Sequence, residues 1–173
     1  MRRPLLGVAA AILCASGACG CCASEYTLIV ESNASPINDG YPVKVDVVIS
    51  RDKASSEELD KKDIARWFEG GRDDFAVRPI NLTVPGEKNF RRTILLRLGD
   101  AADSGQETVG APGTDLIRTI PKDLDALYVF AHYRGAGDAV RKKKIPAEVF
   151  LCEKGRLVIS LGKNAIRDVA VVE

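Results

Sequence analysis

Ala126-Leu127-Tyr128-Val129-Phe130-Ala131-His132-Tyr133 is the most strongly strand-forming stretch of the chain. Its β-branched and aromatic residues favour an extended backbone. Large apolar or aromatic side chains fall on both faces of the stretch, and a strand of this kind must be covered on both sides. We therefore expect it to run through the middle of a sheet.

Shorter segments with strand character lie on both sides of this stretch. Val43 to Ser50 alternates apolar and polar residues with a period of two, which is typical of a strand with one buried face. Further strands are predicted at residues 26–31, 75–84, 90–98, 116–120, 149–152, 157–161 and 166–172. About eight short strands at regular spacing predict a mostly β protein with a β-sandwich fold.

Residues 55–69 predict one helix inserted among these strands. Ser55 and Glu58 have the spacing of a capping box at a helix start. The apolar stripe of the helix is short and consists of Ile64, Trp67 and Phe68. Gly70 and Gly71 follow it and are expected to end the helix. Because the stripe is short, the helix should pack across the edge or end of a sheet.

Residues 99–115 have no periodicity and few large apolar side chains. Loops longer than about 12–15 residues are uncommon inside compact domains. We therefore predict a mobile loop at 99–115.

The N-terminus has the features of an export signal. A short basic region, Met1-Arg2-Arg3-Pro4, precedes an uncharged apolar run over residues 5–13. A membrane-spanning helix needs about 20 apolar residues, so this run is too short to be one. The segment is therefore left out of the predicted fold.

A cluster of cysteines follows the apolar run. Ser16-Gly17-Ala18-Cys19 resembles a lipobox, in which the cysteine is acylated after cleavage, and Cys19 is the predicted lipidation site, with Cys21 as second choice. Ordinary cleavage after Gly20 or Ser24 is the alternative. The predicted parts are a lipoprotein signal peptide at 1–18, a lipid-anchored linker at 19–25 and a β-sandwich domain at 26–173.

Size and charge restrict the function further. Removing 18 of the 173 residues leaves 155, enough for one domain. Loss of Arg2 and Arg3 changes the formal net charge from +1 to −1. A nucleic-acid-binding domain carries a strong positive surplus, so nucleic acid is not an expected partner.

No catalytic residue, metal ligand or cofactor is predicted. His132 is the only histidine, lies within a predicted strand, and is interpreted as a structural or surface residue. No nucleophile motif such as G-x-S-x-G accompanies it. Cys152, the only cysteine beyond the N-terminal cluster, cannot supply a zinc ligand set with one histidine. It is either a buried free thiol or the disulfide partner of Cys21 or Cys22. The protein is not expected to be an enzyme.

The one dense basic run, Arg141-Lys142-Lys143-Lys144, closes a predicted loop. One interpretation is that it steers an acidic partner or lies against anionic lipid. The other is that these charges protect a flanking strand from aggregation.

Several short motifs occur in a recognisable order. They are Cys19, the turn Asn38-Asp39-Gly40, the strand start Pro42-Val43 with Val45, the helix pair Trp67-Phe68, the turn Val84 to Glu87, and the segment Leu127 to Arg134. In this order the chain resembles the type VI secretion outer-membrane lipoprotein (TssJ) family over most of its mature length. The resemblance implies a transthyretin-like or immunoglobulin-like β-sandwich with an added helix.

The resemblance also implies a function. Members are anchored by lipid in the outer membrane, face the periplasm, and bind the periplasmic part of a large inner-membrane subunit of the secretion complex. It places partner contacts in the loops at 32–40 and 135–144. The candidate partner-binding residues are Asn38, Asp39, Gly40, Arg134, Arg141, Lys142 and Lys143. The alternative function is a generic envelope lipoprotein that binds a peptide or a small ligand.

Overall fold

The computed structural model describes residues 25–33, 35–72, 79–100, 107–110, 114–135, 137, 141–151 and 156–172. Cys19, Cys21 and Cys152 lie outside these ranges, and so does the predicted signal peptide. Within these ranges, no helix is long and apolar enough to cross a membrane.

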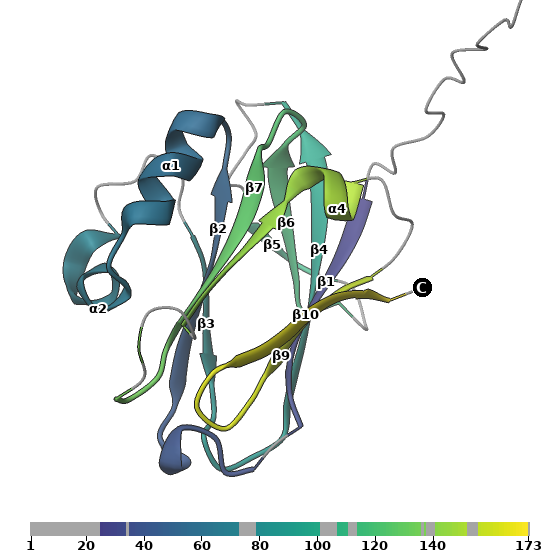
Figure 1. The fold of residues 1–173 in the computed structure, drawn as a ribbon. Coiled ribbons are helices and arrows are strands. Elements are labelled where there is room, and N and C mark those ends of the chain that lie inside the picture. The colour runs from purple at the N-terminus through teal and green to yellow at the C-terminus, as the bar shows by residue number, and fades with distance from the viewer. Residues whose placement is uncertain are drawn as a thin grey trace, which may run out of the picture.

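Ten described strands form two packed sheets (Figure 1). The larger sheet has the order β10-β9-β1-β4-β6-β5, and the smaller has the order β3-β2-β7-β8. The strands of the larger sheet are β1 (Glu25–Ser32), β4 (Phe90–Gly99), β5 (Glu107–Val109), β6 (Leu116–Pro121), β9 (Arg156–Leu161) and β10 (Ile166–Val172). Those of the smaller sheet are β2 (Val43–Ser50), β3 (Ile80–Val84), β7 (Ala126–His132) and β8 (Lys142–Pro146). The predicted mostly β sandwich is confirmed.

The main core lies between the facing sheets. Alternate residues of β2 and β7 point into it, among them Val45, Val47 and Val129. The other face of β7 is buried as well, because Tyr128 and Phe130 are covered by the inserted helices. The prediction that the stretch from Ala126 has two buried faces and a central position in its sheet is therefore confirmed.

The inserted helix is broken and begins earlier than predicted. Helix α1 (Lys53–Lys61) is capped by Asp52, whose carboxylate accepts a hydrogen bond of 2.7 Å from the Ser55 backbone N–H. The predicted Ser55 cap is therefore wrong. Asp63 caps a second short helix, α2 (Ile64–Arg66), which continues into a π-helical turn, η2 (Trp67–Gly71). Because Lys62 and Asp63 are extended, α1 and α2 form separate helices.

Two further predictions of secondary structure are wrong. Residues 149–152 were expected to be a strand, but residues 149–151 belong to a short helix, α4 (Ala147–Leu151), and Cys152 lies outside the described residues. The basic residues Lys142 to Lys144 were expected in a loop, but they belong to β8, which pairs with β7. The region 99–115 contains the short strand β5, which pairs with β6 and which the composition did not reveal.

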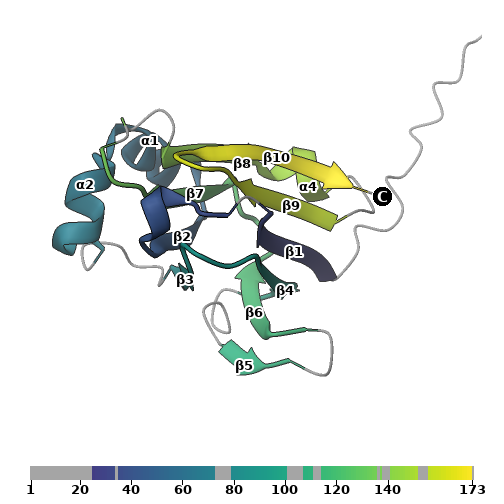
Figure 2. The ribbon, with the colours of Figure 1, turned by 90° about the horizontal axis from the view of Figure 1, so that it is seen from below.

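The sandwich has two distinct ends, which we name the Glu25 end and the η1 end. The Glu25 end holds the start of β1, the finish of β10 and helix α4, whose Leu151 carbonyl accepts a hydrogen bond from the Tyr26 hydroxyl. The η1 end holds the 3₁₀ turn η1 (Asn38–Gly40), the finish of β7 and the β9–β10 connection. Figure 2 shows the layered arrangement from below. Eight residues of β1 separate the two ends, roughly 23 Å at about 3.3 Å per residue.

Candidate functional site

Turn η1 is a tight left-handed turn. Asn38, Asp39 and Gly40 have φ angles of 48°, 53° and 85°. Asparagine, aspartate and glycine are the residues that adopt this region most readily. The Asn-Asp-Gly sequence therefore specifies the backbone here, as its turn motif predicted.

Asn38 is a structural residue of this turn rather than an exposed contact. It is only 4% exposed. Its side-chain oxygen accepts a hydrogen bond of 2.7 Å from the Arg134 backbone N–H, and its side-chain nitrogen donates to the Tyr41 and Pro42 carbonyls. The Asn38 N–H donates to the Lys163 carbonyl at 2.6 Å. One side chain and its backbone therefore join three separate segments of the η1 end.

The exposed part of the η1 end is an aromatic and cationic pair. The Arg134 guanidinium lies 3.4 Å from the centre of the Tyr41 ring. Tyr41 is 47% exposed, which makes it one of three large apolar side chains that stand out from the described surface. Tyrosine and arginine, with tryptophan, are enriched at the energetic centres of protein interfaces. Sequence reasoning missed Tyr41, although it directly follows the predicted Asn-Asp-Gly turn.

A second turn, which contains Gly86 and Glu87, packs against η1 and supports it. The Ile37 N–H donates to the Gly86 carbonyl at 2.8 Å, and the Ser35 hydroxyl donates to the Glu87 carbonyl. A Cβ atom at Gly86 would lie 2.3 Å from the Gly40 carbonyl carbon. Only glycine fits at this approach, which explains the Pro-Gly turn of the sequence motif.

The predicted basic cluster is divided among different positions. The Arg141 guanidinium donates to the Tyr133 carbonyl, so Arg141 lies beside the η1 end. The Lys142 side chain extends towards the inserted helices. Its ammonium donates to the Leu59, Asp60 and Lys62 carbonyls at the end of α1. Lys143 is exposed on β8. The cluster is therefore not one continuous basic loop.

Replacing Lys142 by alanine is expected to reduce the free energy of unfolding by about 1.5–2 kcal/mol. The ammonium satisfies carbonyls that the helix cannot pair itself and interacts favourably with the helix dipole. Lys143→Ala removes the same charge from the next residue of the strand and should change stability by less than about 0.5 kcal/mol. Urea unfolding of both variants would measure the difference. Equal effects would contradict the capping role of Lys142.

The outer face of the smaller sheet carries a buried polar contact with the inserted helices. Asp46 is fully buried and accepts hydrogen bonds from the Trp67 indole N–H at 2.7 Å and from Arg72. Its pKa is raised by burial, against the opposing effect of the Trp67 hydrogen bond and the Arg72 charge. The contact ties η2 to the centre of β2.

A second contact ties α1 to the same sheet. The Tyr128 hydroxyl and the Lys144 ammonium both donate to the Asp60 carboxylate. Partial burial raises the pKa of Asp60, but hydrogen bonds from Lys144 and Tyr128 outweigh it and lower the pKa overall. Lys144 therefore also serves the packing of the inserted helices.

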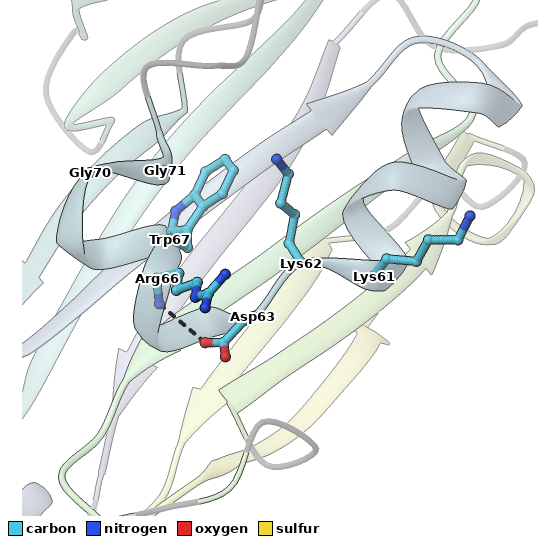
Figure 3. Close-up of a pocket in the computed structure, with 7 residues that line it drawn as sticks. All are labelled: Lys61, Lys62, Asp63, Arg66, Trp67, Gly70 and Gly71. Carbon is cyan, nitrogen blue, oxygen red and sulfur yellow. Dashed lines mark hydrogen bonds between the residues drawn. The ribbon is translucent and has the colours of Figure 1, made fainter.

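A surface pocket of 450 Å³ lies where the inserted helix is broken (Figure 3). The figure shows Asp63 turned back to the Arg66 backbone N–H, while the Lys61 side chain points away from the other labelled side chains. Trp67 is only 1% exposed, and its indole nitrogen is bonded to Asp46. No nucleophile paired with a base lines the pocket.

His132 lies at the end of β7, and its ring stacks on Phe68 with centroids 5.2 Å apart. Partial burial, with the charges of Arg141 and Lys44, lowers its pKa. No group of three or more possible metal ligands occurs in the part of the chain that the structure describes.

The fold of this chain is similar to solved structures of type VI secretion system proteins. The T6SS lipoprotein TssJ1 from Pseudomonas aeruginosa superposes with a TM-score of 0.55 at 12% identity, covering 87% of this chain and 97% of that chain. Serratia marcescens Lip, a membrane-bound component of the type VI secretion system, superposes with a TM-score of 0.51 at 15% identity, covering 87% and 99%.

This chain has the fold of the TssJ lipoproteins. The resemblance found in the order of the sequence motifs is thus confirmed at the level of the fold. Comparisons with protein-family models and with curated proteins find no match.

The TssJ fold is not confined to lipoproteins among the neighbours. The C-terminal domain of the T6SS protein TssM from EAEC superposes with a TM-score of 0.53 at 10% identity, covering 86% of this chain and 98% of that domain. The fold therefore does not by itself separate a TssJ-like chain from a TssM-like domain.

Proposed function

We propose that this chain is a lipid-anchored docking protein of the bacterial envelope, which serves in a type VI secretion membrane complex as TssJ lipoproteins do. In this proposal Cys19 carries the lipid, the outer membrane holds the protein, and the sandwich faces the periplasm. The partner is the periplasmic part of an inner-membrane subunit. The η1 end, with Tyr41 and Arg134 at its surface, binds that partner.

The observation that carries this proposal is the position of the η1 end. The chain enters the sandwich at Glu25, and β1 then leads from this end towards η1. A tether that precedes Glu25 would leave the η1 end directed away from the membrane. The exposed Tyr41–Arg134 pair would then face a partner that approaches across the periplasm.

The N-terminus supports the lipoprotein assignment over the TssM-like one. A basic region, an uncharged run and Cys19 after three small residues are the parts of a lipoprotein signal. More than one acyl chain gives stable membrane attachment, because a single chain binds only marginally.

Affinity purification from detergent-solubilised envelopes tests the proposal. The full-length lipidated protein, tagged at its C-terminus, should recover a large inner-membrane secretion subunit. A variant with Tyr41→Ala and Arg134→Ala should recover much less of it. Recovery of no inner-membrane subunit by the unaltered protein would contradict the docking function and favour a generic envelope lipoprotein.

Lipidation has a separate test. Cys19→Ser should abolish incorporation of labelled palmitate, because the substitution removes the thiol that carries the lipid. Cys21→Ser is the matched control and should retain labelling. Labelling that persists in Cys19→Ser and disappears in Cys21→Ser would move the lipid to Cys21.

A further inference from the structure

We propose that the Glu25 end rests on the bilayer surface, with Val149 of helix α4 as its lipid contact. This inference deepens the proposed function and depends on its lipid tether. It assigns a role to an exposed apolar surface at the end of the molecule opposite η1.

The described surface exposes few large apolar side chains. Val149 is 41% exposed and Val172 is 49% exposed. Both lie at the Glu25 end: the hydrogen bond from Tyr26 to Leu151 joins α4 to β1, and Val172 pairs with Arg156 of β9, which in turn pairs with Thr27 of β1. Two of the three exposed apolar side chains thus gather where the chain enters the fold.

The length of the tether keeps this surface close to the membrane. Six peptide units join Cys19 to Glu25, and a fully extended chain of that length spans about 20 Å. The tether is shorter than the distance between the two ends of the sandwich. The Glu25 end is therefore held nearer to the lipid than the η1 end. Short tethering raises the effective concentration of a weak contact, so a small apolar surface is enough.

Two exposed ion pairs lie at this end. Arg97 contacts Glu25 at 2.7 Å, and Lys122 contacts Asp100 at 3.1 Å. Because each pair cancels its own charge, these groups should add little attraction to anionic lipid. The contact is therefore expected to be apolar and similar on zwitterionic and anionic bilayers.

Quenching by brominated lipid gives a direct test. Trp67 is the only tryptophan of the chain, begins η2 and is only 1% exposed, so the fluorescence of the unaltered protein serves as the baseline. Val149→Trp places a second indole at the Glu25 end, and Asn164→Trp places one between β9 and β10 at the η1 end. The lipidated full-length proteins are reconstituted in phosphatidylcholine vesicles with bromine on the acyl chains.

The new indole of Val149→Trp should be quenched several-fold more than that of Asn164→Trp, both in pure phosphatidylcholine and with added phosphatidylglycerol. Equal quenching of the two variants in protein that floats with the vesicles would overturn the inference and leave the anchor intact. Failure of the protein to float would overturn the anchor and this inference together.

Two further outcomes would also decide whether the Glu25 end contacts lipid. A concentration-dependent blue shift of Val149→Trp in detergent, without quenching in vesicles, would assign the surface to a second copy of the chain. If Val149→Trp fails to fold, Val172→Trp at the same end provides the same readout, and quenching no greater than that of Asn164→Trp would overturn the inference.

Discussion

Replacing Trp67 by alanine is expected to lower the free energy of unfolding by about 3–5 kcal/mol. The indole is 1% exposed and meets the Phe130 ring edge to face, with centroids 4.9 Å apart. Its N–H also donates a hydrogen bond of 2.7 Å to the buried Asp46 carboxylate. Truncation therefore opens a cavity on the outer face of the smaller sheet and removes one partner of a buried acid.

Urea unfolding followed by circular dichroism measures this effect. Trp67→Phe keeps most of the apolar volume and loses the indole donor, so its loss should be smaller, about 1–3 kcal/mol. Glu69→Ala changes an exposed residue of the same turn and should alter stability by less than about 0.5 kcal/mol. A loss below about 1 kcal/mol for Trp67→Ala would mean that the inserted helices do not dock on the sheet.

The second large effect concerns binding. Tyr41→Ala combined with Arg134→Ala should weaken binding of the proposed inner-membrane partner by at least roughly 30-fold, which corresponds to about 2 kcal/mol. The two side chains form a stacked pair at the surface of the η1 end, and neither supports the core. Folding stability should change little, because both side chains are exposed.

Surface plasmon resonance with the periplasmic part of the partner measures the affinity. Lys88→Ala, an exposed change near the same end, serves as the control and should leave the affinity within about twofold. Asn38→Ala should lower stability and affinity together, since it loosens the three segments that Asn38 joins. Unchanged affinity in the Tyr41 and Arg134 double variant would exclude this pair as the docking centre.

The strands of the core were predictable from sequence because their patterns depend on local periodicity. Val43 to Ser50 alternates with a period of two, and β2 has the bounds this predicts. The segment beginning at Ala126 is apolar on both faces, and β7 is covered on both. These patterns follow directly from burial, which acts on each strand face separately.

Other elements could not be read from local patterns. The run Lys142 to Lys144 has the composition of a solvated loop, but two of its ammonium groups find partners on α1, far away in sequence. Residues 147–151 have apolar composition suited to either a strand or a helix, and a short run of this kind is ambiguous. Asp52, three residues before Ser55, was an available capping signal for the helix start.

The candidate site was predicted only in part. The Asn-Asp-Gly turn and Arg134 were identified, and the structure brings them together at one end of the sandwich. Lys142 lies elsewhere, because its charge is used to end a helix. Tyr41 was missed because an aromatic residue after a turn has no distinctive spacing, and only the fold shows that it remains uncovered.

The placement of β1 also has a mechanical consequence. This strand joins the two ends of the sandwich and is bonded along both sides, to β4 over eight residue pairs and to β9 over five. If the protein is pulled between a membrane and a partner, the load enters along the axis of β1. Both ladders then resist in shear, so that many hydrogen bonds share the force and do not break one after another. Such a strand is suited to the proposed role, in which the chain links a membrane to a partner.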